Sequence, residues 1–193
     1  MKRVILIASA FLITLLITAC GSSIAVPPEQ QAIIDKQEVV YTQVNMWEGK
    51  NKVYGINYNK GLMIPVNSKV KILAVNAKVI TFEFMDQKIN YYTHKKYTKV
   101  DSIAMMKRIF GTKPVDLTKF SKLAQENIKA GTLAVGMTKE ETIVSRGYPP
   151  LYTTLSLKAD YWKFHHFKVF GIGKTTSVSF KDGKISKIEG GAH

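Results

Sequence analysis

Four histidines are the residues of this chain that most directly suggest metal chemistry. His165 and His166 are adjacent, so on a strand they point to opposite faces and cannot chelate one metal ion together. His94 and His193 lie in different regions, and neither a His-x-x-His nor a Glu-x-x-His spacing occurs. Structural or surface roles are therefore expected for all four, with an adventitious metal contact as the alternative. No metal site and no cofactor is predicted.

Two further patterns bear on phosphate binding and hydrolysis. Gly173-Lys174-Thr175 invites comparison with a phosphate-binding loop, but that motif needs a glycine five positions before Gly173, where the chain has Lys168. A turn between two strands is expected there instead. Serines are plentiful, yet no Gly-x-Ser-x-Gly elbow is present. An enzyme is therefore not expected, and a triad assembled in space from distant residues is the alternative.

The single cysteine excludes an intramolecular disulfide framework and a zinc site built from several thiolates. It follows a basic pair, Lys2-Arg3, and an apolar run over residues 4–17 that is too short to span a bilayer comfortably. Such a run is typical of the central region of a secretory signal peptide. The run ends in Ile17-Thr18-Ala19-Cys20, and this junction resembles the bacterial lipobox, in which a small residue precedes a cysteine that is diacylated and becomes the mature amino terminus. Residues 1–19 are therefore expected to be a lipoprotein signal peptide and Cys20 the lipidation site. A buried cysteine at the end of a membrane helix is the alternative.

A lipid on Cys20 would attach the protein to a membrane without a spanning helix. Each buried methylene contributes roughly 0.8 kcal/mol and one acyl chain holds a protein only marginally, so two or three chains are required. Gly21 in the second mature position, rather than Asp, resembles the pattern of lipoproteins sent to the outer membrane. The expected location is therefore the outer membrane, with the folded part facing the periplasm.

Basic residues outnumber acidic ones along the whole chain. Lys and Arg total 28 against 14 Asp and Glu, a formal net charge of +14. This excess predicts either a solvated lysine-rich surface or a face held against anionic lipid headgroups, where each nearby basic residue contributes about 1 kcal/mol. Nucleic acid is not expected as a partner of an exported lipoprotein. Hydrophobic residues make up 46% of the chain, enough for a folded core.

The first half of the mature chain has mainly the two-residue periodicity of strands. Residues 20–35, with Ser22, Ser23, Pro27 and Pro28, are expected to be a lipidated tether. Residues 36–112 are predicted to be a β-rich module, a small antiparallel sheet or open barrel that ends in a helix. Its expected strands cover residues 38–47, 52–58, 69–75, 79–84 and 89–93, with turns at residues 48–51, 76–78 and 85–87.

Two helices are predicted where the period changes. Asp101 is a good N-cap, and Ile103, Met106 and Phe110 share one face of the helix that follows. Gly111 is expected to end that helix.

The second helix is expected to begin near Asp116 and to end at Gly131. Its apolar stripe is expected to consist of Leu117, Phe120, Ala124 and Ile128. The module boundary is placed between Gly111 and Asp116.

The last third carries an ordered series of short motifs. Thr138 and Glu141 have the spacing of a capping box, and Gly147 is expected to end that short helix. Residues 161–170 and 175–180 are expected to be strands, and Asp182-Gly183 is a strong hairpin signal before a returning strand over residues 184–188.

The order Gly-Met-Thr, acidic helix start, Gly-Tyr-Pro-Pro, Trp-x-Phe and Val-x-Phe-x-Asp-Gly-Lys resembles the SmpA/OmlA family, the BamE-like lipoproteins, over roughly Asp116 to Glu189. The resemblance implies an ααβββ two-layer domain over residues 113–193. It also implies a non-enzymatic accessory role in the machine that inserts β-barrel proteins into the outer membrane. The β-rich part before Gly111 has no counterpart in the short members. The positions that match the family pattern are structural: Gly136, Met137, Thr138, Glu141, Gly147, Trp162 and Gly183.

Trp47 and the tyrosines of the first half are predicted to pack in the core, with an exposed aromatic groove for peptide or glycan as the alternative. The predicted function is that of a binding or accessory factor in envelope assembly with an envelope protein as partner. A cell-wall or glycan-binding lipoprotein is the first alternative, and a periplasmic inhibitor or hydrolase is the second.

Overall fold

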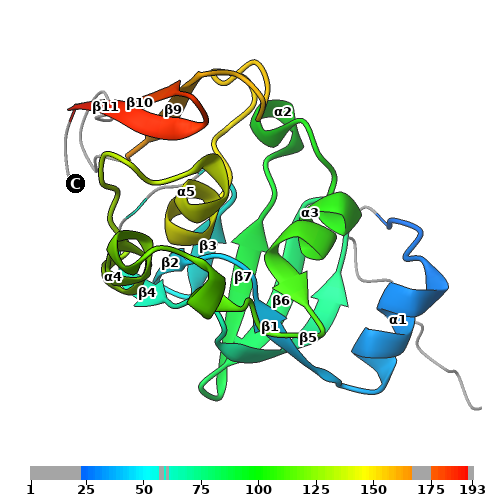
Figure 1. The fold of residues 1–193 in the computed structure, drawn as a ribbon. Helices are drawn as coiled ribbons and strands as arrows, with labels where there is room; N and C mark the ends of the chain where they lie inside the picture. Colours follow the sequence, from blue (N-terminus) through cyan, green and yellow to red (C-terminus); the bar gives the residue numbers. More distant parts are fainter. Residues whose placement is uncertain (1–22, 57–58, 60, 167–174, 191–193) are drawn as a thin grey trace, which may run out of the picture.

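The computed structural model describes residues 23–56, 59, 61–166 and 175–190 of the chain. Both halves of the described part contain helices and strands, and the strands form two sheets (Figure 1). The predicted α+β class is confirmed. Cys20, Gly173, Lys174 and His193 lie outside the described residues.

The larger sheet has eight strands in the order β4-β2-β3-β7-β6-β5-β1-β8. They are β1 (Val39–Thr42), β2 (Met46–Gly49), β3 (Lys52–Tyr54), β4 (Leu62–Ile64), β5 (Lys69–Val75), β6 (Val79–Phe84), β7 (Gln87–Tyr92) and β8 (Phe110–Gly111). Neighbouring strands are antiparallel except β3 and β7, which run parallel with Val53 opposite Tyr91. The expected small antiparallel sheet is therefore larger than predicted and is mixed in direction. Its edges are β4 and β8.

The predicted turns of this sheet are confirmed, and their residues explain the tight connections. Asn76 Oδ1 accepts from the backbone amides of Lys78 and Val79, both at 2.9 Å, and so closes the β5–β6 turn. Met85 and Asp86 adopt φ values of 49° and 60° between β6 and β7. Positive φ at both central residues gives a turn whose twist matches that of the flanking strands.

One predicted strand, residues 38–47, is interrupted. The chain leaves the sheet after Thr42 and re-enters it at Met46, so β1 and β2 pair with different partners. Asn45 lies between them and is 1% exposed, with its side chain bonded to three backbone groups. The buried polar side chain fixes this bend, and period-two hydrophobicity does not reveal it.

Part of the predicted tether is helical. Helix α1 covers Pro28–Asp35, with proline in its first turn, where no backbone amide is needed inside the helix. Ile33 and Ile34 of α1 pack against the first hydrophobic cluster. The tether prediction therefore fails from Pro28 onward, because these two isoleucines give the helix a face to bury.

Helix α3 (Ser102–Ile109) begins as predicted, since the Asp101 side chain accepts from the Ala104 amide at 2.8 Å. The short helix α2 (Lys95–Thr98) precedes it. The prediction that Gly111 ends α3 is wrong: Phe110 is already extended, and Phe110–Gly111 form β8 opposite Tyr41 and Thr42. At Phe110 the backbone pairs with β1 instead of continuing the helix.

The second predicted helix begins later than expected. Asp116 caps a single 3-10 turn, η1 (Leu117–Lys119), and Ser121 then caps α4 (Lys122–Ala130). Gly131 ends α4 with a φ of 67°, as predicted. The Asp116 and Ser121 side chains each accept a hydrogen bond from a backbone amide at the start of η1 and α4, so interrupting the helix between η1 and α4 costs little.

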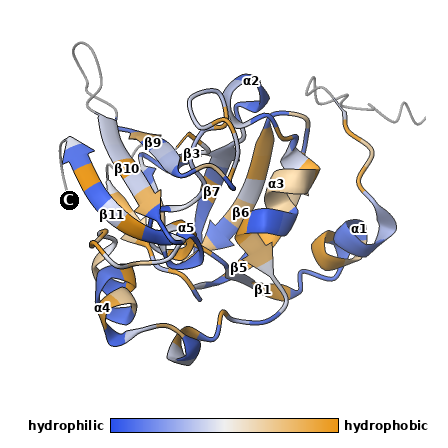
Figure 2. Cartoon of the chain, turned by 45° about the horizontal axis from the view of Figure 1, so that its top comes forward, coloured by the Kyte–Doolittle hydropathy of each residue, from blue (hydrophilic) through white to orange (hydrophobic). Residues whose placement is uncertain are grey.

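Helix α5 (Lys139–Arg146) has the predicted capping box, and three antiparallel strands follow it in the order β11-β10-β9. These are β9 (Tyr161–His165), β10 (Thr175–Lys181) and β11 (Lys184–Gly190). Asp182 and Gly183 make the predicted hairpin, with φ values of 52° and 75°. Hydrophobic and hydrophilic residues alternate along β11 in Figure 2, as expected for a sheet with one buried face.

The buried side chains form two clusters that divide near the predicted module boundary. The first joins the eight-stranded sheet to α1 and α3, and the second joins α4 and α5 to the three-stranded sheet. Val66 from the first half belongs to the second cluster, and Ile143 of α5 packs against both. The two modules are therefore in direct contact. Within the described ranges, no helix combines the length and hydropathy that crossing a membrane requires.

Candidate functional site

The residues that carry the family resemblance hold the second module together. Glu141 accepts from the Thr138 amide at 2.7 Å, while Thr138 Oγ1 accepts from the Glu141 amide at 3.2 Å. Glu141 also accepts from the backbone and hydroxyl of Ser121, the N-cap of α4. One buried carboxylate thus connects the starts of α4 and α5.

The segment before α5 is connected to the sheet in the same way. The Gly136 amide donates to the Ile185 carbonyl at 2.8 Å, and the Ile185 amide donates to the Met137 carbonyl at 2.7 Å. Met137 is fully buried, as is Trp162 on β9. Gly147 ends α5 with a φ of 76°. Of the seven positions, Met137 and Trp162 lie in the core, Thr138 and Glu141 form the cap of α5, Gly147 ends α5, and Gly136 and Gly183 have positive φ.

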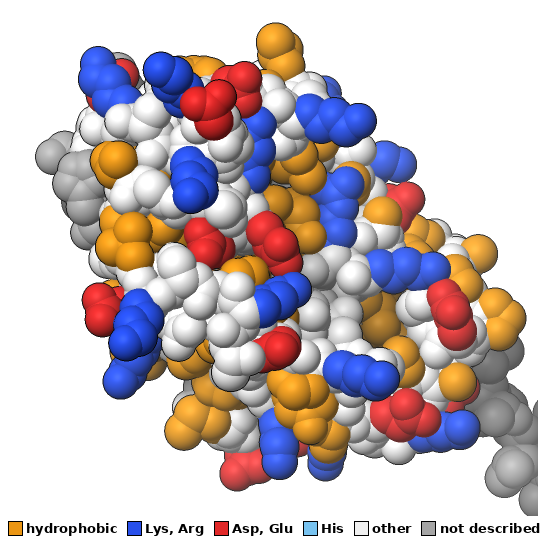
Figure 3. Space-filling model, in the orientation of Figure 1, with side chains coloured by type: hydrophobic (Ala, Val, Ile, Leu, Met, Phe, Trp, Pro, Cys, Tyr) orange, Lys and Arg blue, Asp and Glu red, His pale blue; other side chains and the backbone are white. Residues whose placement is uncertain are grey.

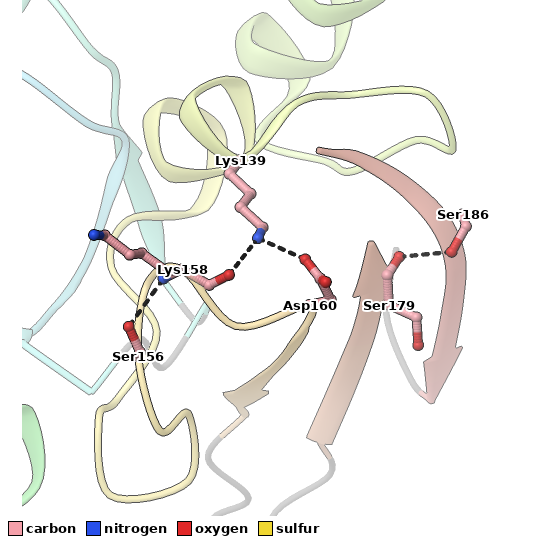
Figure 4. A network of polar contacts seen from close by, with 6 residues as sticks. All are labelled: Lys139, Ser156, Lys158, Asp160, Ser179 and Ser186. Carbon is pink, nitrogen blue, oxygen red and sulfur yellow. Dashed lines mark hydrogen bonds and ion pairs between the residues drawn. The ribbon is translucent and has the colours of Figure 1, made fainter. Parts of the chain in front are cut away.

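Lys139 fixes the loop that leads into β9. Its Nζ donates to the Lys158 carbonyl and to Asp160 Oδ1, both at 2.8 Å (Figure 4). The ammonium group also lies 5.2 Å from the centre of the Phe180 ring. These contacts hold the loop between α5 and β9 in place.

Asn45 and Arg146 connect the two modules, and neither was singled out from the sequence. Asn45 Nδ2 donates to the carbonyls of Ile128 and Ser145 at 2.6 and 3.2 Å, and its Oδ1 accepts from the Val66 amide at 2.7 Å. The Arg146 guanidinium is buried and donates to the Gly131 carbonyl at 3.0 Å.

Arg146 also lies 5.6 Å from the ring of Trp47, on β2 of the other module. Burial lowers the pKa of Arg146 to about 10, so it stays charged at neutral pH. In the sequence, Arg146 stands in the last turn of a predicted helix beside Gly147. This position does not distinguish a buried arginine from one at an exposed helix end, where basic residues are common.

A row of six rings crosses between the modules. Tyr54, Tyr92, His94 and Tyr97 come from the first module, and Tyr152 and His165 from the second. Successive ring centres are 5.0–6.5 Å apart, and three pairs are stacked at 20–22°. The Tyr152 amide also donates to the Tyr97 carbonyl at 3.1 Å. The row joins the two modules. None of its six rings is buried, and Tyr152 is 45% exposed. The predicted core packing therefore does not hold for the tyrosines of this row, and an exposed aromatic surface remains the alternative.

The histidines contact rings and hydroxyl groups. His165 Nε2 lies 3.1 Å from the hydroxyls of Tyr152 and Thr153, and His166 Nε2 lies 2.7 Å from Thr176 Oγ1. Burial lowers the pKa of His94 and His165, and burial together with Arg146 and His165 lowers that of His166 to about 4. The part of the chain that the structure describes contains no group of three or more side chains suited to a metal ion.

A cleft of about 690 Å³ lies where the modules meet. Its apolar floor includes Phe110 of the first module and Ile143 of α5, and its rim carries Lys119 and Glu140, an ion pair at 3.1 Å. Arg108 lies 5.2 Å from the ring of Tyr148 at the same cleft. Figure 3 shows hydrophobic side chains at the bottom of this hollow with both signs of charge around it. An apolar floor with a mixed polar rim suits a polypeptide partner.

Comparison with known proteins adds no relative to these observations. No family model, no curated protein and no solved structure matches the chain. The interpretation of the site therefore depends on its sequence motifs and its geometry.

Proposed function

We propose that this protein is a lipid-anchored lipoprotein of the outer membrane that faces the periplasm and acts as a non-enzymatic binding factor in envelope assembly. The observation that carries the proposal is Cys20 at the end of a signal-peptide-like segment, directly before a folded body. Helix α1 begins at Pro28, only a short tether away from that cysteine.

The architecture of the second module supports the proposed role in envelope assembly, which the resemblance to the SmpA/OmlA family implies. Two helices followed by a three-stranded antiparallel meander are what the SmpA/OmlA resemblance implies. In this proposal the lipid raises the concentration of the protein at the membrane, and the cleft at Ile143 and Phe110 receives a segment of an envelope protein.

Anchoring is tested by comparing the wild type with Cys20→Ser in cells that carry out lipoprotein processing. Wild type is expected in the outer-membrane fraction with a lipid mass on Cys20, and Cys20→Ser is expected in the soluble periplasmic fraction. Ser22→Ala is the matched control and should behave as wild type. An unmodified thiol at Cys20 in membrane-purified protein would refute the anchor.

The partner is tested by affinity purification from detergent-solubilised membranes. A β-barrel assembly complex is expected to co-purify with wild type and to be lost with Ile143→Arg, which places a charge on the cleft floor. Lys113→Glu, which changes charge near but outside the cleft lining, is the control. Retention on purified peptidoglycan without any protein partner, or turnover of a substrate, would contradict the proposal.

A further inference from the structure

Besides the cleft between the modules, a groove of about 450 Å³ opens between α1 and α3. Val40 of β1 and Phe110 of β8 form its floor, and Ile33 of α1 and Met106 of α3 form its walls. In Figure 3 this groove is visible toward the right of the molecule as a hollow with hydrophobic side chains at its bottom. Lys107 Nζ and Glu29 Oε1 form an ion pair at 2.8 Å that connects α3 to α1 beside it.

One polar group in the groove lacks a partner. Gln30 lines the groove and is 7% exposed, and its Oε1 atom accepts no hydrogen bond from the residues that the structure describes. That oxygen has almost no accessible surface, so a ligand in the groove would meet the apolar floor and walls instead.

The start of the mature chain is apolar once it is acylated, and it is close enough. Residues 21–27 separate Cys20 from α1, and an extended chain covers up to about 3.3–3.6 Å per residue, so the lipid can reach a groove lined by the first turns of α1. Ile24 and Val26 are half-buried, which indicates that the described part of the tether follows the protein surface. The lipid on Cys20 would supply the apolar chain.

We propose that the groove between α1 and α3 holds one fatty acyl chain of the lipid attached to Cys20. This inference rests on the proposed function, because it requires the cysteine to be acylated. Methylene groups gain about as much free energy in an apolar groove as in a bilayer, and the short tether favours the groove by keeping the chain nearby. The remaining chain or chains stay in the membrane as the anchor.

The test is photo-crosslinking with the full-length protein. Cells are fed a palmitate analogue that carries a diazirine near its end, and the protein is purified in detergent, irradiated and digested for mass spectrometry. The analogue attached to Cys20 is expected to crosslink to peptides covering residues 29–40 and 105–112. Crosslinks from labelled Cys20 that are confined to residues 20–27 and to detergent would overturn the inference.

Two tryptophan variants of α1 sharpen the result. Ala32→Trp fills the groove and should lose most of the groove crosslinks while Cys20 stays labelled. Gln31→Trp, one position away and outside the groove lining, should keep them. Circular dichroism establishes that both variants are folded, and the wild-type crosslink map decides the question if Ala32→Trp is not. Equal groove crosslinking in both folded variants would refute the assignment.

Two further outcomes distinguish failure of the proposed lipidation from failure of the groove assignment, and the attached lipid from a free lipid of the membrane. An intact mass that shows no lipid on Cys20 would refute the proposed function itself. Cys20→Ser protein should crosslink the free analogue in the same groove. If the free analogue labels the groove but the attached one does not, the groove takes a lipid from the membrane and the inference about this chain's own anchor is wrong.

Discussion

Asn45→Ala should loosen the contact between the modules more than any other single side-chain truncation that we predict. The variant removes three hydrogen bonds and leaves the buried Val66 amide without its partner, while the Ile128 carbonyl keeps a bond from the Gly131 amide at 3.2 Å. A typical internal hydrogen bond contributes about 1 kcal/mol, so the loss is expected to be about 3 kcal/mol. For a protein of this size that corresponds to a decrease in Tm of roughly 6–12 °C.

The matched control is Asn76→Ala, which truncates the same side chain in a half-buried turn at the surface. Asn76 also accepts two backbone hydrogen bonds, but water can replace them, so its loss should be about 1 kcal/mol or less. Thermal and urea unfolding followed by circular dichroism measure both variants against wild type.

A second substitution at the same position separates bonding from volume. Asn45→Asp has nearly the same shape and still accepts from the Val66 amide, but it turns an oxygen toward the carbonyls of Ile128 and Ser145. It should therefore be destabilised at neutral pH and partly recover when the carboxylate is protonated. If Asn45→Ala costs no more than Asn76→Ala, the reasoning that this side chain joins the modules is refuted.

Three smaller predictions follow from single features of the fold. Gly131→Ala should lower the free energy of unfolding by more than the ~1 kcal/mol that a strained left-handed residue costs, because its Cβ would lie 2.7 Å from atoms of Trp47 and Met63. The control is Gly183→Ala, which has a similar φ but open space around it and should cost about 1 kcal/mol. Urea unfolding compares the two variants. Thr138→Ala should cost about 1 kcal/mol through loss of the N-cap, measured the same way, and a neutral result would contradict the capping box. The pKa of His166 is about 4 in the folded protein and near 6.5 in the unfolded chain. Between these pH values the unfolded chain binds more protons, so stability should fall as the pH decreases from about 6.5 toward 4. Tm measured across that range should depend less on pH in His166→Asn than in wild type.

Local chemistry explains why much of the second module was predictable. The capping box at Thr138 and Glu141, the glycine ends at Gly131 and Gly147, and the Asp182-Gly183 hairpin each depend on residues close together in the chain. Their geometry is decided within one turn of structure, so a short window of sequence contains the cause.

The features that sequence did not reveal depend on distant partners. The parallel pairing of β3 with β7 joins residues almost forty positions apart, and β8 exists only because β1 is available to pair with Phe110 and Gly111. Asn45 falls inside the predicted strand over residues 38–47, and its role is evident only when Ile128 and Ser145 are placed beside it. The tether prediction depended on Ser22, Ser23, Pro27 and Pro28, whereas the buried face of α1 comes from Ile33 and Ile34.

The cleft and the groove share part of their lining, and this links the two proposals. Lys107, Phe110 and Gly111 line both, so the short strand β8 separates a site proposed for a protein partner from one proposed for a lipid chain. Phe110 is only 6% exposed and packs at 5.2 Å, edge to face, against Phe82 of the sheet, which leaves it little room to move. An acyl chain in the groove would therefore press against the same ring that forms the floor of the cleft. Because close-packed side chains transmit displacements, occupation of one site should change the affinity of the other, and the lipid would then affect partner binding as well as location.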